Sequence, residues 1–153
     1  MKTFILPDSR IAALKAGFAV AFGGEPERFF SAPGRTELGG NHTDHQHGKV
    51  LAAAVDLDTQ AAVRENGSSQ IRIVSKGYPR CTVDLAQLEP VEQEQGTTAA
   101  LIRGVAARFA QLGYEVGGFD AYIESTVLPG SGLSSSAAFE VLLGTLMNHL
   151  FCS

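Results

Sequence analysis

The chain has 153 residues, of which 44% are hydrophobic and 18% charged, and its formal net charge is −4. This apolar content excludes an intrinsically disordered chain, and the acidic balance argues against sequence-independent nucleic-acid binding, which needs clustered Lys and Arg. Cys81 and Cys152 lie too far apart for a disulfide framework, which fits a reducing compartment. No run approaches the roughly 18 apolar residues of a membrane span. We therefore expect a cytoplasmic protein with no nucleic-acid and no membrane partner.

The N-terminal region is predicted to contain a helix and a strand, followed by a polar loop. Residues 8–22 carry apolar side chains at helical spacing and precede a glycine pair, which predicts an amphipathic helix ending at Gly23. Residues 29–32 form a short apolar run, which indicates a strand. Residues 34–48 are polar and rich in glycine, which predicts a loop that can open into a short helix.

The middle of the chain is predicted to be rich in strands. Residues 50–55 are small and apolar, which predicts a strand buried on both faces. Residues 59–64 and 70–74 alternate in a strand-like way around Asn66-Gly67, a dipeptide typical of a hairpin turn. Residues 81–85 could add another strand.

The C-terminal region is predicted to add two helices around one more strand. A helix begins at Thr98 and ends at Gly113, and residues 119–127 alternate as a strand. A last helix is predicted from the serines to about Leu150, and its side chains are apolar nearly all round. Such a helix needs other elements packed against more than one side, and because the sequence ends directly after it, we expect a truncated chain. The order of elements predicts an α+β fold, with a mixed β-sheet and helices packed on one face.

The first candidate functional segment lies between the last strand and the last helix. Glycines allow positive φ, so successive N–H groups can converge on one anion, and a helix N-terminus adds unpaired donors. Serine hydroxyls can also ligate a hard cation such as Mg²⁺. A plain glycine turn with a serine cap is the alternative. The segment therefore predicts phosphate binding by Gly130, Ser131, Gly132, Leu133, Ser134, Ser135 and Ser136.

The second candidate segment is the polar stretch 34–48. The planar guanidinium of Arg35 suits phosphate or developing negative charge. Asn41, His42 and Asp44 supply the donors and acceptors that sugar hydroxyls require. A solvated polar loop is the simpler interpretation, but the glycines and the scarcity of lysine argue against it.

The same stretch also allows a metal-site interpretation. Asp44 and the three histidines at 42, 45 and 47 could ligate zinc, as in a zinc hydrolase. A second group of ligands is missing, because only His149 remains elsewhere in the chain.

Together the two segments resemble the first two signature motifs of the galactokinases, within the GHMP kinase superfamily. The family's first motif, Gly-Arg-x-Asn-Leu-Ile-Gly-Glu-His-Thr-Asp-Tyr, is followed without gaps by residues 34–45. Its second motif, Gly-x-Gly-Leu-Ser-Ser-Ser-Ala, is matched in full by residues 130–137. Residues 103–105 and 117–120 also resemble galactokinase sequences.

The resemblance implies a GHMP kinase N-terminal fold (ribosomal S5 domain 2-like) and transfer of the ATP γ-phosphoryl group to the anomeric hydroxyl of galactose or a related sugar. Arg35 matches the family's transition-state-stabilising arginine. Residues 130–136 match the ATP phosphate loop, within which Ser136 matches a Mg²⁺-contacting serine. The stretch that holds the sugar is matched by Asn41, His42, Thr43 and Asp44.

The chain departs from the family pattern in its first motif. Asn41 stands where galactokinases carry glutamate, Glu37 where they carry asparagine, and His45 where they carry tyrosine. Because a charged acceptor and an amide bind hydroxyls differently, the identity of the sugar stays open.

The family's catalytic aspartate, its magnesium-binding glutamate and its third motif are not found before Ser153. We therefore expect residues 1–153 to be a truncated N-terminal GHMP kinase domain that is inactive alone and whose partner is the missing C-terminal half. One alternative is a sugar or ATP sensor that has lost turnover. Another is a kinase of a different alcohol, such as homoserine or mevalonate, although the His-Thr-Asp stretch argues against it.

Overall fold

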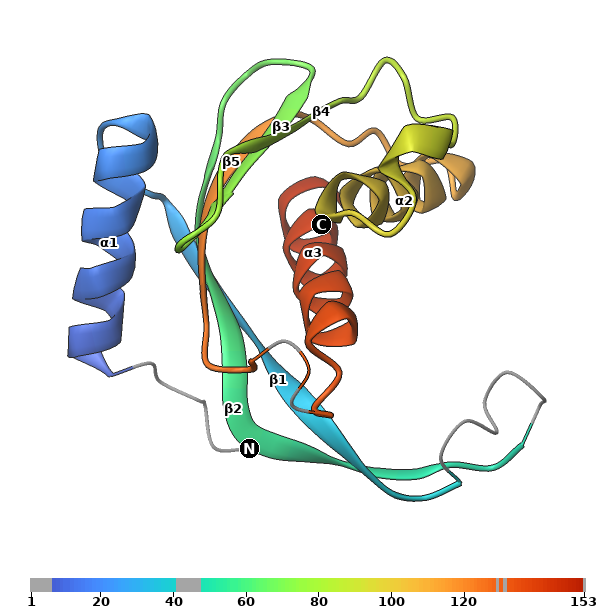
Figure 1. Ribbon diagram of the computed structural model, residues 1–153. Helices are drawn as coiled ribbons and strands as arrows, with labels where there is room; N and C mark the ends of the chain where they lie inside the picture. The colour runs from blue at the N-terminus through green and yellow to red at the C-terminus, as the bar shows by residue number, and fades with distance from the viewer. Residues whose placement is uncertain (1–6, 41–47, 129, 131, 153) are drawn as a thin grey trace.

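The computed structural model describes residues 7–40, 48–128, 130 and 132–152. Within them the chain forms three α-helices, a short 3-10 helix and one five-stranded sheet (Figure 1). In chain order the elements are α1 (Asp8–Phe22), β1 (Arg28–Gly39), β2 (Leu51–Glu65), β3 (Gln70–Ser75), β4 (Cys81–Asp84), η2 (Glu92–Glu94), α2 (Thr98–Gln111), β5 (Phe119–Ser125) and α3 (Ser135–Phe151).

The sheet has the strand order β1-β2-β5-β3-β4. The pairs β1–β2, β2–β5 and β3–β4 are antiparallel, whereas β3 and β5 run parallel. The predicted α+β class with a mixed sheet is therefore confirmed.

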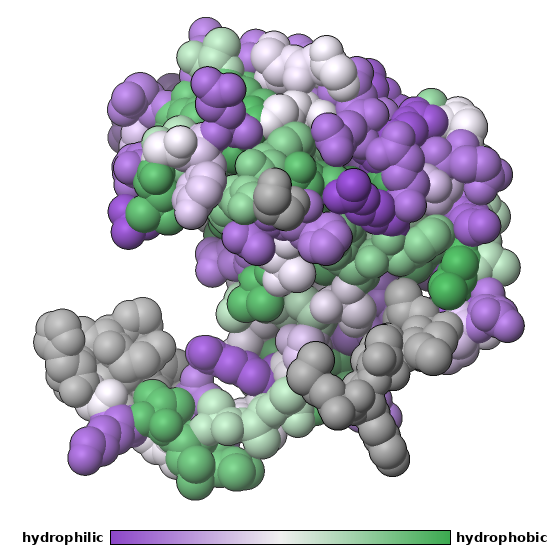
Figure 2. Space-filling model, turned by 180° about the vertical axis from the view of Figure 1, so that it is seen from behind, coloured by the Kyte–Doolittle hydropathy of each residue, from purple (hydrophilic) through white to green (hydrophobic). Residues whose placement is uncertain are grey.

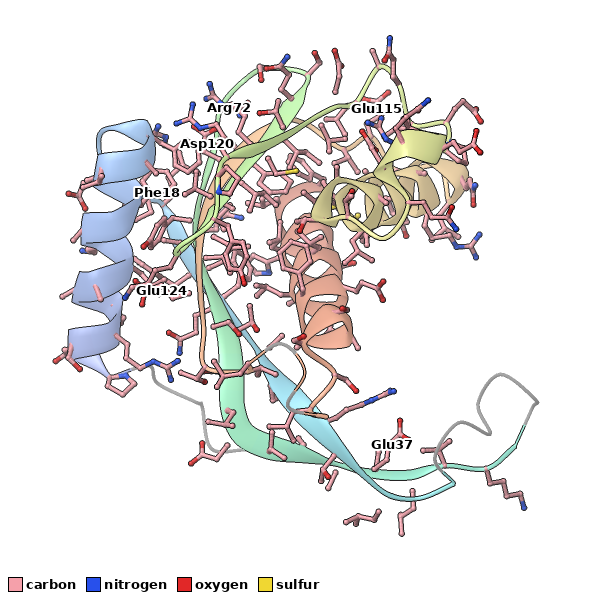
Figure 3. All side chains as sticks on the ribbon, in the orientation of Figure 1. Phe18, Glu37, Arg72, Glu115, Asp120 and Glu124 are labelled. Atoms are coloured by element: carbon pink, nitrogen blue, oxygen red, sulfur yellow. The ribbon has the colours of Figure 1, made fainter. Side chains whose placement is uncertain are left out.

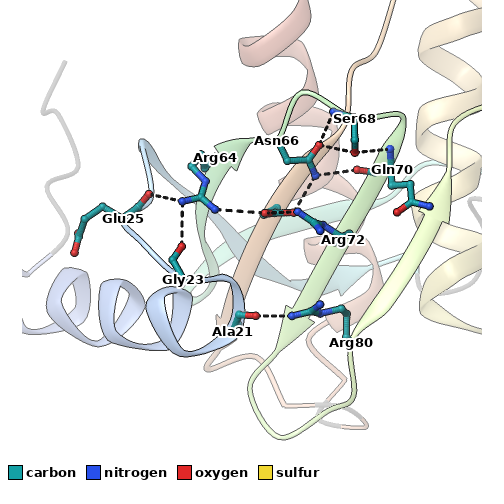
Figure 4. A network of polar contacts seen from close by, with 10 residues as sticks. Ala21, Gly23, Glu25, Arg64, Asn66, Ser68, Gln70, Arg72 and Arg80 are labelled. Carbon is teal, nitrogen blue, oxygen red and sulfur yellow. Dashed lines mark hydrogen bonds and ion pairs between the residues drawn. The ribbon is translucent and has the colours of Figure 1, made fainter.

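The hairpin predicted around Asn66-Gly67 is wrong, because β2 and β3 do not pair with each other. β5 lies between them in the sheet. Gly118, just before β5, enters the loop: its N–H donates to the Ser68 carbonyl at 2.8 Å, and its own carbonyl accepts from the Asn66 N–H at 3.1 Å. A Cβ at Gly118 would lie 2.3 Å from that Ser68 oxygen, so only glycine admits the approach. The Asn66 side chain donates to the Gln70 carbonyl and accepts from the Ser68 N–H, which fixes the loop around it (Figure 4).

Helices lie on both faces of the sheet. Figure 1 shows α2 and α3 on one side and α1 on the other, so the prediction that the helices pack on one face is wrong for α1. The reason lies in β2, where Ala61 and Val63 point to one face and Ala62 to the other. All three are fully buried, and an apolar strand of this kind needs cover on both sides.

Helix α1 follows the predicted boundaries and ends at Gly23, which has a φ of 73°. It buries Leu14 and Phe18 against the sheet, and Phe18 points from the helix toward the strands in Figure 3. Gly17 allows this close packing, since a Cβ there would lie 2.1 Å from the ring of Tyr122 on β5.

The larger core lies between the sheet and helices α2 and α3. Residues 119, 121 and 123 of β5 point into it, as their alternation predicted. Helix α3 is covered by the sheet and by α2, although Val141 stays 57% exposed. The buried residues that the two helices supply are Ile102, Ala106, Leu142, Leu143, Leu146 and Met147.

The outer parts of β1 and β2 form an arm that leaves the body of the molecule. β5 reaches β2 only at Thr59, so residues 51–58 pair with β1 alone among the described strands. The expectation that residues 50–55 are buried on both faces is wrong here, because residues 51–54 are exposed. Figure 2 shows hydrophobic side chains on this arm, where Leu38 and Leu51 are 67% and 64% exposed.

Two further expectations are a loop over residues 34–48 and the absence of a membrane-spanning segment. Residues 34–39 belong to β1 and not to a loop, while residues 41–47 lie outside the described residues. No helix among the described residues combines the length and hydropathy that a membrane span requires.

Candidate functional site

The segment between β5 and α3 has the backbone geometry of an anion-binding loop. Gly130 and Gly132 have φ values of 75° and 76°, and Ser134 is left-handed at φ 55°, the single described non-glycine residue with positive φ. Ser134 occupies the N-cap of α3, but its side chain makes no capping hydrogen bond. The first N–H groups of a helix have no acceptors within the helix, so this helix start presents donors to an external acceptor.

Arg35 on β1 meets this loop through two hydrogen bonds and makes a third to Glu37 on its own strand. Its backbone N–H donates to the Leu133 carbonyl at 3.2 Å, and its Nε donates to Ser134 Oγ at 3.3 Å. Its Nη2 donates to Glu37 Oε1 at 3.0 Å. The fold thus brings the arginine of the first motif to the serines of the second, from positions almost a hundred residues apart in sequence.

Gly34 makes the meeting of strand and loop possible. A Cβ at this position would lie 3.0 Å from Val127 Cγ2 and 3.2 Å from the Leu133 carbonyl oxygen. A larger residue would push β1 away from the loop and would move Arg35 with it.

The other predicted site residues divide into described and undescribed ones. Ser135 and Leu133 are half-buried, whereas Gly130, Gly132 and Ser136 are exposed. Five predicted site residues lie outside the described residues, and the structure gives no account of them: Asn41, His42, Thr43, Asp44 and Ser131.

The zinc interpretation finds no support in the described part of the chain. Within that part, no group of three or more His, Cys, Asp or Glu side chains could hold a metal ion. The ring of His149, on α3, packs edge-on against Phe30 with centroids 5.7 Å apart. His45 and His47 lie outside the described residues, as does His42.

A cavity of about 740 Å³ opens beside Ser135 and Ser136. Apolar side chains from β3, β5, α2 and α3 line part of it, and the turn after β3 adds polar ones. Sequence reasoning missed this cavity, because hydrophobic periodicity marks its apolar residues only as core. The lining includes Ile73, Lys76, Tyr78, Cys81, Leu101 and Phe139.

The polar groups around the cavity are held in place by ion pairs and hydrogen bonds. Lys76 Nζ lies 3.1 Å from Glu124 Oε1. Burial, together with the Glu94 carboxylate, raises the pKa of the Cys81 thiol above its ordinary value of 9.0. Arg10 of α1, which also lines the cavity, pairs with the buried Asp58.

Asp58 ties α1 to the sheet. It accepts hydrogen bonds from Arg10, from Ser31 Oγ at 2.6 Å and from Gln60 Nε2 at 2.8 Å. Burial acts to raise the pKa of this carboxyl, but the hydrogen bonds from Ser31, Arg10 and Gln60 outweigh it and lower the pKa below its ordinary 3.8. The Asp58 carboxylate thereby holds Arg10, which itself lines the cavity.

The two shorter family-like segments have structural roles. Arg103 is buried, donates to both Glu94 carboxylate oxygens at 2.8 Å and to the Gln87 carbonyl, and so fastens α2 to the connection before it. Asp120 is fully buried, and its carboxylate accepts two hydrogen bonds from Arg72, at 2.6 and 2.8 Å (Figure 3).

Two family signatures match the chain. Residues 16–65 match the galactokinase galactose-binding signature, and residues 100–153 match the GHMP kinase N-terminal domain. A galactokinase of Bacillus subtilis is 38% identical over 141 residues, which are 90% of this chain and 36% of that protein. A galactokinase of Lacticaseibacillus paracasei is 36% identical over 137 residues, covering 88% and 35% of the two chains. The chain is similar to galactokinases over most of its length. It spans about a third of the length of these curated relatives.

Solved structures show the same similarity to galactokinase. The crystal structure of Lactococcus lactis galactokinase complexed with galactose matches with a TM-score of 0.82 and 30% identity, over 92% of this chain and 37% of that one. The mevalonate kinase of Methanococcus jannaschii shares the fold, with a TM-score of 0.65 and 17% identity over 82% of this chain and 40% of that one.

Proposed function

We propose that this chain is the N-terminal GHMP domain of a longer galactokinase-like enzyme, which transfers the γ-phosphoryl group of ATP to the anomeric hydroxyl of galactose or a related sugar. The observation that carries the proposal is the contact between Arg35 and Ser134, because it joins the two family motifs at the start of α3. The remaining, C-terminal part of the protein would be the partner of this domain.

Arg35 would act on the transferring phosphoryl group. Its guanidinium is fixed by Ser134 and Glu37 at the N-terminus of α3, and its side chain is 46% exposed, so it can reach a bound anion. During transfer, negative charge spreads over the phosphoryl oxygens, and a fixed cation at that place stabilises the transition state.

Residues 130–136 would hold the phosphates of ATP. The positive φ of Gly130 and Gly132 turns the loop, and the uncapped start of α3 supplies N–H donors and the positive end of the helix dipole. The exposed Ser136 is the residue that would hold Mg²⁺, whose charge neutralises phosphate oxygens when it is bound.

The cavity beside the serines would receive the nucleoside of ATP. It begins at Ser135 and Ser136 and continues along apolar side chains such as Leu101 and Phe139, which suit a flat heteroaromatic base. Its volume of about 740 Å³ is ample for a nucleoside.

The sugar would be bound by residues 41–44, next along the chain after β1. Asn41, His42, Thr43 and Asp44 provide the mixture of donors and acceptors that hydroxyl groups need. The galactose in the L. lactis structure supports a galactose-like substrate, and Asn41, Glu37 and His45 are positions at which this chain departs from the family pattern.

The proposal is tested by assaying ADP formation by the full-length protein with MgATP and a panel of monosaccharides. We expect turnover with galactose or a close relative, and Arg35→Ala should lower kcat by about 100- to 1000-fold while sugar binding persists. Arg28→Ala, on the same strand, is the matched control and should leave kcat unchanged. ADP formation with none of the sugars would contradict the proposal.

A further inference from the structure

The guanidinium of Arg35 is paired with a carboxylate of the chain itself. Nη2 donates to Glu37 Oε1 at 3.0 Å while Nε donates to Ser134 Oγ at 3.3 Å. A guanidinium has five N–H donors, so three remain for a ligand. The Glu37 side chain is only 17% exposed, and screening by water is therefore weaker for it than for an exposed carboxylate.

This carboxylate is a departure from the first motif of the family. At the position of Glu37 the galactokinase motif carries asparagine, whose amide is neutral. Glu37 and Arg35 stand two positions apart on β1, so their side chains emerge on the same face of the strand. The small Ala52 opposite Glu37 on β2 leaves room for the pair.

We propose that Glu37 is a positioning residue that serves as an internal counterion of Arg35, holding its guanidinium at the start of α3 and lowering its affinity for the terminal phosphoryl group of ATP. This inference rests on the proposed function. A phosphoryl group that approaches Arg35 competes with Glu37 for the same N–H donors and is repelled by the same carboxylate. Removing the charge while keeping the acceptor oxygen should therefore strengthen nucleotide binding.

The test is a calorimetric titration of the chain and its variants with ATP, ADP and inorganic tripolyphosphate at low ionic strength. Glu37→Gln keeps an oxygen that accepts from Arg35 but removes the charge, and it should bind ATP about three- to ten-fold more tightly. ADP lacks the terminal phosphoryl group, so its affinity should differ much less between Glu37→Gln and the wild type. Glu37→Asp retains the charge and should bind ATP like the wild type.

Glu115→Gln is the matched control. It removes the same charge from an exposed residue that lies at the other end of the molecule (Figure 3), and ATP affinity should not change. The gain in Glu37→Gln should also shrink as salt is added, because added ions screen the repulsion.

Each outcome bears on a different claim. If the wild type binds ATP but Glu37→Gln binds it equally or more weakly, or gains equally for ADP, the counterion role is overturned. If ATP does not bind, but tripolyphosphate binds more tightly to Glu37→Gln than to the wild type, the counterion role stands and the proposed nucleotide binding is overturned. If neither binds to any variant, both are overturned.

Discussion

Replacing Asp120 should cost this fold more stability than any exposed carboxylate would. Its carboxylate accepts two hydrogen bonds from Arg72, at 2.6 and 2.8 Å, and one from Asn66 Nδ2 at 2.9 Å. Arg64 Nη2 lies 3.6 Å away on the neighbouring strand. The Asp120 carboxylate thus joins β5 to β2, to β3 and to the loop that connects those two strands. Figure 4 shows its partners Arg64, Asn66 and Arg72.

The size of the effect follows from the burial of each partner. Breaking a buried ion pair costs about 3–5 kcal/mol, because the remaining charge stays in the interior. Here the Asp120 side chain is 1% exposed, but those of Arg72 and Arg64 are 36% and 28% exposed and can regain water. We therefore expect Asp120→Ala to lower the free energy of unfolding by about 2–4 kcal/mol.

The assay is urea unfolding followed by far-UV circular dichroism. Asp56→Ala, at an exposed position on β2, is the control and should stay within about 0.5 kcal/mol of the wild type. Asp120→Asn keeps an acceptor for Arg72 and should lie between Asp120→Ala and the wild type. A loss below about 1 kcal/mol in Asp120→Ala, with an unchanged m-value, would refute the reasoning.

Three further predictions concern the helices, the pH dependence and the cavity. Gly17→Ala should lower the free energy of unfolding by about 1–3 kcal/mol, because its Cβ would lie 2.1 Å from the Tyr122 ring. Gly104→Ala, with nothing within 4 Å of its Cβ, should raise it by up to about 1 kcal/mol in the same urea assay. Because the pKa of Asp58 is lowered in the fold, its ionised form stabilises the fold at pH values above the ordinary pKa of 3.8. This stabilisation is lost as the pH falls through the lowered pKa. Asp58→Asn should therefore show a smaller fall in Tm than the wild type between about pH 5 and 3. ATP should slow the alkylation of Cys81, which lines the cavity, as measured by mass spectrometry.

Each of these predictions has an internal comparison. Cys152 lies outside the cavity lining and should react at the same rate with and without ATP. Equal stability changes in the two glycine variants would contradict the packing of α1 on β5. Parallel Tm curves for the wild type and Asp58→Asn would show that Asp58 does not drive acid unfolding.

The helices could be placed from the sequence because their signals are local. α1 ends at Gly23 and α2 begins at Thr98, as glycine and the apolar spacing predicted. The strand pairing could not be predicted in the same way. Asn66-Gly67 has the composition of a hairpin turn, but β5 inserts between the two strands, and the backbone of Gly118 that permits this lies about fifty positions further along.

The site shows the same division between local and distant information. The serine loop was predicted from its composition, and its glycines have the positive φ that anion binding favours. The pairing of Arg35 with Glu37 depends on strand geometry, and its contact with Ser134 depends on how β1 passes α3. The cavity was missed because residues such as Leu101 line it while looking like ordinary core residues in the sequence.

The central claim is that the start of α3 and the adjoining cavity bind ATP, and amide chemical-shift mapping with MgATP tests it most directly. We expect the largest shifts at Gly130, Gly132 and residues 134–136, with further shifts at Lys76 and Leu101 in the cavity. Arg35→Ala should weaken the binding without moving the set of shifted residues. Shifts confined to other surfaces, such as the outer side of α1, or no shifts at all, would contradict the account.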